Sequence, residues 1–186
     1  MIRIAALALG LSLCSVPASA QELPPIEERQ ALLFDAAREG RTDIVEILAM
    51  TGVDLNAYDA RGFTPVILAA YAGHAQTVSA LVAAGADPCL ADRAQGNTAQ
   101  MGVAFRGYDD LAAQLLDTEC DVDARNGAGQ TALMMAALFG RYRQVEMLIT
   151  AGADVGIADA EGRTAASVAA VQGNSELAQR LTRQPD

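Results

Sequence analysis

The sequence contains no lysine and no tryptophan, and His74 is its single histidine. Positive charge is therefore carried by arginine alone, with 13 arginines against 23 aspartates and glutamates and a formal net charge of −10. Nucleic acids and anionic membrane surfaces are bound through basic patches that displace counterions. The composition argues against both as partners. It fits a chain kept dispersed by its own charge, or one with a basic partner.

Motifs for catalysis are also scarce. A zinc site needs several histidine, cysteine or carboxylate ligands at close spacing, and the sequence has no Cys-x-x-Cys or His-x-x-x-His pair. It lacks Gly-x-Ser-x-Gly and any glycine loop that would cradle a phosphate. Asp121 and Asp123 lie in a loop, where turn formation is the ordinary explanation and a hydrolytic carboxylate pair the alternative. We expect no enzymatic activity, no metal and no cofactor.

The longest uncharged apolar run lies at the N-terminus. Arg3 precedes about ten apolar residues, 4–13, which is too short for the ~20 residues that span a bilayer. Ala18, Ser19 and Ala20 then form a small-x-small cleavage signal. We predict a signal peptide over residues 1–20 with cleavage before Gln21, which leaves a mature chain of net charge −11 without a membrane-inserted segment. Lipidation of Cys14 is the rival interpretation, but Leu13 stands where a small residue would be typical.

The rest of the chain repeats with a period of about 33 residues. Four threonines, Thr64, Thr98, Thr131 and Thr164, are spaced 34, 33 and 33 residues apart. A parallel series of aspartates, Asp54, Asp87, Asp121 and Asp154, has spacings of 33, 34 and 33. Such self-similarity is the signature of a repeat architecture.

Each repeat predicts two short helices. Threonine is a good N-cap, and Gly73, Gly107, Gly140 and Gly173 follow at the distance of a helix C-terminus. Apolar residues at helical spacing, such as Val78, Leu81 and Val82, then mark a second helix. Asp-x-x-Gly begins the turn into the next unit, so each unit reads as turn, helix, helix and loop.

This pattern resembles the ankyrin repeat, over roughly residues 30–183. The resemblance implies an all-α solenoid of about five helix-turn-helix units joined by β-hairpin-like loops. We place a lead-in segment at residues 21–29 and the repeat domain at 30–186, with units at about 26–58, 59–91, 92–125, 126–158 and 159–186. The first unit has Ala31 where the threonine belongs and is predicted to be the N-terminal cap that a stack requires.

Departures from the pattern are as informative as matches. The histidine of the family's Thr-Pro-Leu-His is absent from every copy. His74 occupies the family's Gly-His position, where capping of the second helix is expected rather than base catalysis. Glu119 stands where Gly85 and Gly152 close the equivalent helices. A left-handed non-glycine residue costs on the order of 1 to 2 kcal/mol, so this helix end is either remodelled or strained.

The resemblance also implies a binding surface made of the hairpin tips and the inner face of the first helices. Five of the eight aromatic residues of the chain fall on this face, with arginines beside them, which is the composition of an interface hot spot. The alternative is that single rings pack against the next repeat. The candidate partner-binding residues are Tyr58, Arg61, Phe63, Tyr71, Phe105, Arg106, Arg125, Leu138, Phe139 and Arg163.

Two cysteines remain beyond the predicted signal peptide, Cys89 and Cys120, both in loops of adjacent units. Packed helices lie about 8 to 10 Å apart, whereas a disulfide needs Cα atoms within roughly 7 Å. The loop offset could narrow or widen that gap, which leaves a disulfide and two packed thiols both open.

The functional expectation follows from the resemblance to small secreted ankyrin proteins of Gram-negative bacteria. It implies a periplasmic protein, monomeric when free, that serves as adaptor or protector of a protein client through its concave face. An immunity protein or inhibitor of an enzyme or toxin is an alternative. A small thiol-dependent or hydrolytic enzyme is the alternative from another class.

Overall fold

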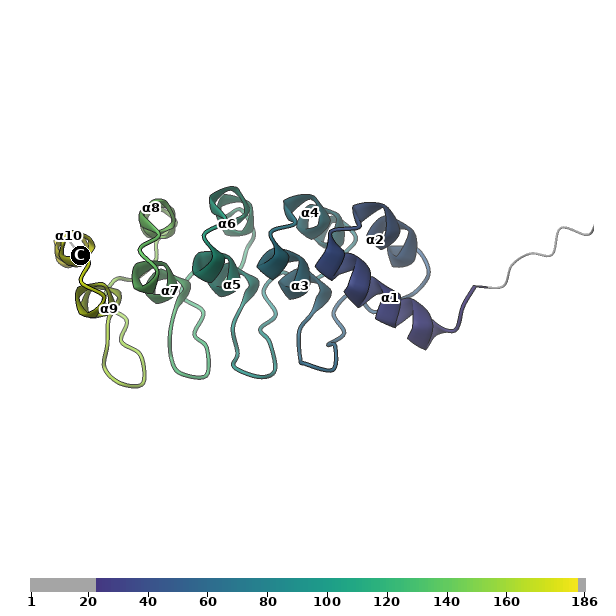
Figure 1. Cartoon of the computed structure of the whole chain (residues 1–186), viewed down its shortest axis with the longest axis horizontal. Helices are drawn as coiled ribbons and strands as arrows, with labels where there is room; N and C mark the ends of the chain where they lie inside the picture. The colour runs from purple at the N-terminus through teal and green to yellow at the C-terminus, as the bar shows by residue number, and fades with distance from the viewer. Residues whose placement is uncertain (1–22, 184–186) are drawn as a thin grey trace, which may run out of the picture.

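The computed structural model describes residues 23–183, and within them it contains ten α-helices and no β-strand. The helices form five consecutive pairs stacked side by side (Figure 1), so the predicted all-α solenoid of five units is confirmed. The predicted signal peptide, residues 1–20, lies outside the described residues. The pairs are α1 (Ile26–Glu39) with α2 (Thr42–Ala49), α3 (Pro65–Ala72) with α4 (Ala75–Ala83), α5 (Ala99–Arg106) with α6 (Asp109–Leu116), α7 (Ala132–Leu138) with α8 (Tyr142–Thr150), and α9 (Ala165–Val171) with α10 (Ser175–Thr182).

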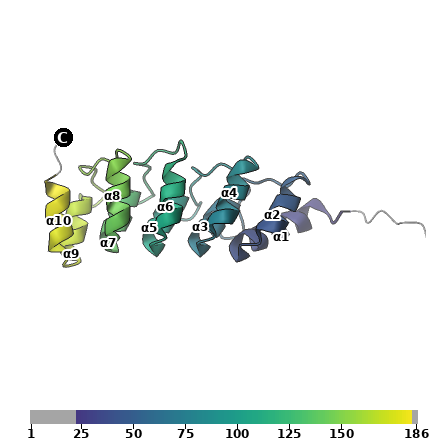
Figure 2. The same cartoon turned by 90° about the horizontal axis from the view of Figure 1, so that it is seen from above.

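The stack has two layers. The first helices of the units, α1, α3, α5, α7 and α9, pack successively on one another and form what we call the inner layer. The second helices form the outer layer, in which α2, α4, α6 and α8 are in contact along the stack. The long loops project from the inner layer in Figure 1, and the view from above in Figure 2 shows the successive pairs side by side.

Threonine caps start four of the inner helices, as predicted. The side-chain oxygens of Thr64, Thr98, Thr131 and Thr164 each accept a hydrogen bond from the backbone amide three residues on. At α9 the bond is reciprocated, because Ser167 Oγ accepts from the amide of Thr164. Each cap satisfies an otherwise unpaired helix amide and is worth about 1 kcal/mol.

Small residues allow the inner helices to approach closely. Ala69 and Ala70 of α3 and Ala136 and Ala137 of α7 are fully buried between neighbouring units. Two clusters of buried apolar side chains fill the stack, one from α1 to α6 and one from α5 to α10. Because each unit contacts only its neighbours, stability depends on the joints between units.

The residue that follows the glycine after α3, α5 and α7 reaches back to the preceding unit. His74 has its ring against Gly40, and its Nε2 lies 3.1 Å from the carbonyl oxygen of Arg38 at the end of α1. His74 is the N-cap residue of α4, as predicted, but its side chain makes no capping hydrogen bond to that helix. The reason is geometric: the side chain faces the unpaired C-terminal carbonyls of α1, which need a donor. Tyr108 and Arg141 take the same position over Gly73 and Gly107.

The structure corrects the predicted start of the domain at α1 and decides between the two alternatives for the end of α6. Helix α1 begins at Ile26, so the predicted lead-in over 21–29 is too long and the domain starts before residue 30. The helix can begin directly after Pro25 because Glu27 and Glu28 suit a first turn. At the other boundary, no non-glycine residue among those described has a positive φ. Glu119 is therefore not strained; the end of α6 is remodelled, with Thr118 donating to Leu115 through both its amide and its hydroxyl.

Candidate functional site

Four aromatic rings form a continuous row along the inner layer. Phe63 lies before α3, Tyr71 is on α3, Phe105 is on α5, and Phe139 ends α7. The ring centroids are 6.2 Å apart from Phe63 to Tyr71, 6.5 Å from Tyr71 to Phe105 and 4.8 Å from Phe105 to Phe139, the last in an edge-to-face arrangement. We call this row the aromatic ladder. It joins three units into one apolar surface.

The two ends of the aromatic ladder differ in exposure. Phe63 and Tyr71 are half-buried, whereas Phe105 is 43% exposed and Phe139 is 40% exposed. Burial of the Tyr71 ring, together with the negative charge of Asp92, raises the pKa of its hydroxyl, which therefore stays protonated. Large apolar rings left in contact with one another and with water are costly for a monomer and typical of a surface that a partner covers.

The Tyr71 ring packs against Gly102, a position where any side chain would clash with it. A Cβ built on Gly102 of α5 would lie 2.5 Å from Cε2 of the Tyr71 ring, closer than real side chains approach. The equivalent position carries Leu68 in the preceding unit and Met135 in the next. The sequence analysis did not select Gly102. A glycine inside an eight-residue helix costs about 1 kcal/mol, and that cost indicates that the position has a structural role.

We expect Gly102→Leu to displace the Tyr71 ring and lower stability by about 1 to 3 kcal/mol, the usual cost of overpacking. Thermal unfolding followed by circular dichroism measures the loss. Adding Tyr71→Ala to Gly102→Leu removes the clash and should recover part of it, since the two positions are in direct contact. Independent, additive losses from the two substitutions would show that the Tyr71 ring does not depend on Gly102.

Beside the first half of the aromatic ladder lies a hollow of about 340 Å³, which we call the inner hollow. Its floor is apolar and its rim carries three arginines. The lining residues are Arg38, Arg61, Phe63, Ile67, Leu68, Tyr71, Ala72 and Arg106. Four of these, Arg61, Phe63, Tyr71 and Arg106, are predicted site residues, whereas the sequence analysis did not select Arg38.

The three arginines are held to different degrees. Arg38 contacts Asp35 at 2.6 Å and Asp59 at 3.6 Å, and Arg61 lies 3.5 Å from Asp59 with its guanidinium 5.1 Å from the Phe63 ring centroid. Arg106 donates to the Tyr108 hydroxyl at 3.0 Å and has no carboxylate within 4.0 Å among residues 23–183. Its positive charge is thus uncompensated within the described chain.

Asp59 keeps its charge beneath this rim. Partial burial raises its pKa. Hydrogen bonds from the backbone amides of Phe63 and Arg61 and the adjacent Arg61 guanidinium lower it by more, so the net pKa lies below the usual value. The ionised carboxylate orients Arg38 and Arg61 toward the hollow.

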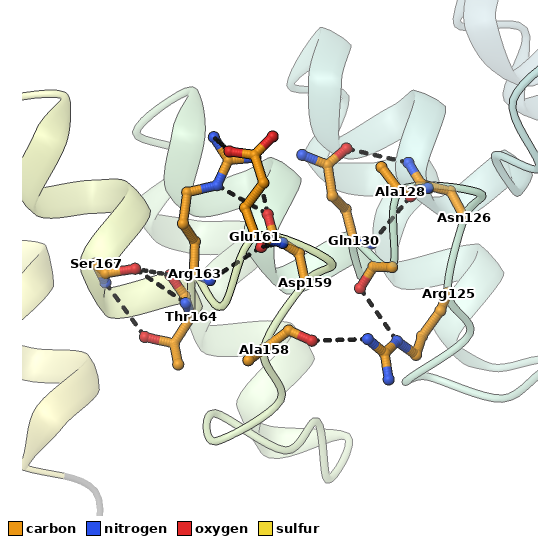
Figure 3. A network of polar contacts seen from close by, with 11 residues as sticks. Arg125, Asn126, Ala128, Gln130, Ala158, Asp159, Glu161, Arg163, Thr164 and Ser167 are labelled. Atoms are coloured by element: carbon orange, nitrogen blue, oxygen red, sulfur yellow. Dashed lines mark hydrogen bonds and ion pairs between the residues drawn. The ribbon is translucent and has the colours of Figure 1, made fainter.

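Other predicted site residues serve contacts within the chain. Arg125 donates to the carbonyl oxygens of Gly129 and Ala158, at 3.1 and 2.7 Å, and so joins two hairpins. Arg163 pairs with Asp159 at 2.8 Å inside its own hairpin (Figure 3). These partners require the folded loops and are not visible in the sequence.

Tyr58 and Leu138 also lie outside the inner hollow. The Tyr58 ring is covered by the guanidinium of Arg93, 4.0 Å from its centroid. Leu138 is half-buried beside Phe139 in α7. The structure therefore brings together Arg61, Phe63, Tyr71, Phe105, Arg106 and Phe139, whereas the four other candidates belong to neither the aromatic ladder nor the lining of the hollow.

A covalent bond joins the second and third units. Cys89 and Cys120 form a disulfide, with sulfurs 2.07 Å apart and Cα atoms 5.2 Å apart. At the neighbouring joints the residue equivalent to Cys89 is Asn56 or Asp123, whose side chain accepts the backbone amide of the next unit. The disulfide thus takes the place of a hydrogen bond. It also leaves no free thiolate within residues 23–183 for a thiol-dependent reaction.

The carboxylates weighed as a hydrolytic pair form loop hydrogen bonds. Asp121 accepts the amide of Asp123 at 2.9 Å, and Asp123 accepts the amide of Asp154 at 3.0 Å. Burial is the main cause that raises the pKa of Asp123, with the nearby charges of Asp121 and Asp154 adding to it. Across the described part of the chain, no group of three or more histidines, cysteines and carboxylates is placed to hold a metal. No helix of that part is long and apolar enough to cross a membrane.

Comparison with known proteins agrees with the architecture. A family model described as ankyrin repeats (3 copies) matches residues 11–92, 75–159 and 100–186. Oxysterol-binding protein-related protein 1 of Rattus norvegicus is 44% identical over 66 residues, which is 34% of this chain and 7% of that protein. Calmodulin-binding transcription activator 6 of Arabidopsis thaliana is 37% identical over 106 residues, 50% of this chain and 13% of that protein. The chain thus spans about a tenth of the length of these relatives.

Proposed function

Because the chain belongs to the ankyrin repeat family, we propose that it is a periplasmic binding module that holds one protein client against the aromatic ladder. Ankyrin repeats generally mediate protein–protein interaction, but a fold alone does not identify a client. The observation that carries the proposal is the exposed edge-to-face pair of Phe105 and Phe139 at the centre of the inner layer. Exposed aromatic anchors beside arginines are the residues that dominate binding energy at interfaces.

The role that fits this surface is adaptor or protector. The surface is extended, lies on a rigid stack and is continuous over three units. Rigid surfaces bind without a large ordering cost, so such a site can hold a folded client or one of its segments.

Two features support the periplasm as the compartment. The N-terminal pattern is that of a cleaved signal peptide, and a disulfide between adjacent units is typical of an oxidising environment. We expect the chain recovered from the periplasm of an expressing Gram-negative cell to begin at Gln21, as read by intact mass. A mass that retains residues 1–20, or recovery only with the cytoplasmic fraction, would overturn this part of the proposal.

Client capture is tested with a photoreactive side chain at Val171, which is 80% exposed at the end of the inner helix α9. Amine-directed reagents suit this chain poorly because it has no lysine. Met50, 81% exposed in the outer layer, is the matched control position. A discrete protein adduct from Val171 and not from Met50 supports the proposal. Equal labelling from both positions, or none from Val171, would contradict it.

A further inference from the structure

We propose that the inner hollow and the aromatic ladder bind an extended segment of the client that carries acidic side chains next to aromatic or branched apolar ones. This inference rests on the proposed function and specifies its partner. It is argued from the charge of the hollow, the chemistry of its arginines and the spacing of the rings.

Three arginines gather at the hollow of a chain whose net charge is negative. The protein has a formal net charge of −10, yet three arginines surround the hollow and two carboxylates, Asp35 and Asp59, are paired with them. Arg106 has no carboxylate of the described residues within 4.0 Å. Asp92, whose charge acts on Tyr71, is 4% exposed, and its carboxylate accepts the backbone amides of Ala94, Gln95 and Asn97. An anionic group entering the hollow can pair with the Arg106 guanidinium, whereas a basic group would be repelled by it.

The arginines are suited to carboxylates. Guanidinium groups bind carboxylates through two parallel hydrogen bonds and remain charged at any physiological pH. Arg61 is held over the Phe63 ring and against Asp59, so part of its conformational entropy is lost before a partner arrives. The apolar side chains of Ile67, Leu68 and Tyr71 line the same hollow as these groups and lower the local dielectric, which strengthens each ion pair.

The ring spacing matches an extended chain. Successive side chains on one face of a β-strand are two residues apart, about 6.6 to 6.8 Å. The first two steps of the aromatic ladder are 6.2 and 6.5 Å. Alternate apolar side chains of an extended segment can therefore meet successive rings, while the hollow of about 340 Å³ receives single side chains rather than a folded surface.

The test is selection from a random dodecapeptide library on the purified chain, followed by affinity measurement of the selected peptides by fluorescence anisotropy. We expect enrichment of aspartate or glutamate next to aromatic or branched residues, with apolar residues two positions apart. Affinity should fall as salt is raised, because the ion pairs are partly exposed. Selection of basic or uncharged sequences, or no enrichment, would overturn the proposal.

Substitution of the rim locates the binding. The triple variant Arg38→Gln, Arg61→Gln, Arg106→Gln should weaken the selected peptides at least about tenfold. The matched control, Arg41→Gln, Arg143→Gln, Arg180→Gln, removes the same charge and breaks ion pairs in the outer layer, and should change affinity less than about twofold. Equal weakening in both variants would contradict an inner site.

A single substitution covers the case in which the triple variant does not fold. Arg106→Gln breaks no ion pair of the described chain, so its fold should persist while peptide affinity falls several-fold. Arg106→Lys should retain more affinity than Arg106→Gln, and equal affinity of the two variants with the original chain would count against the proposal.

The two proposals fail separately. A client adduct at Val171 without acidic peptides in the selection leaves the binding function standing and overturns the partner chemistry. Acidic peptides in the selection without any client adduct would support the partner chemistry and overturn the proposed binding function.

Discussion

Replacing Phe105 and Phe139 together with alanine is expected to weaken client binding by at least about thirtyfold while the thermal midpoint falls by no more than about 5 °C. A single anchoring aromatic at an interface contributes 2 kcal/mol or more, which is about thirtyfold in affinity. The stability cost is small because both rings are exposed by 40% or more, so truncation leaves no buried cavity. What the folded chain loses is mainly their mutual contact, worth about 0.5 to 1.5 kcal/mol.

Tyr142 offers a matched control for this experiment. It is 41% exposed but lies on α8 in the outer layer, where its hydroxyl donates to Asn174 at 2.6 Å. Tyr142→Ala should leave client affinity unchanged. Binding is read by titration of the captured client and stability by differential scanning calorimetry. A large fall in thermal midpoint with unchanged affinity would identify Phe105 and Phe139 as packing residues.

Removal of the disulfide should have the largest effect on stability. Cys89 and Cys120 are 31 residues apart, and closing a loop of that length in the unfolded chain corresponds to about 3 to 4 kcal/mol in the chain-entropy account. For a chain of this size the double variant Cys89→Ser, Cys120→Ser should unfold about 10 °C lower than the oxidised protein. The effect should be centred on the second and third units, because repeat stacks are stabilised by nearest-neighbour contacts.

Reduction of the unsubstituted chain is the control for the two serines. The reduced protein should have a thermal midpoint close to that of the double variant. Both lack the cross-link, and they differ only in that serine carries oxygen where cysteine carries sulfur at the two positions. A thiol count on the denatured, unreduced chain should find Cys89 and Cys120 unreactive. Two reactive thiols in that assay, or equal thermal midpoints with and without reductant, would show that the bond does not form in solution.

The sequence was sufficient for the repeat itself. A threonine cap and the glycine that ends its helix act within one unit, over spacings fixed by helix geometry, so Thr64 and Gly73 could be read from the chain. The same counting placed Tyr71, Phe105 and Phe139 on one face, and the structure joins them with Phe63 into the aromatic ladder.

What the sequence did not reveal are contacts between units. Three such contacts join residues 31 to 36 positions apart: the His74 ring contacts the end of α1, the Tyr71 ring packs on Gly102, and Arg125 links two hairpins. Their geometry depends on how far one unit is shifted against the next, which no residue within a single unit determines. The disulfide was left open for the same reason, because it depends on the remodelled end of α6.

The disulfide also decides how the stack responds to tension. Residues 90–119 contain α5 and α6 entire, and the bond closes them into a loop that a pull on the two ends of the chain bypasses. At about 3.3 to 3.6 Å per residue, the oxidised chain extends roughly 100 Å less than the reduced one. The unit that carries Gly102, Phe105 and Arg106 is thereby shielded from tension applied at the two ends of the chain, which extends the flanking units first.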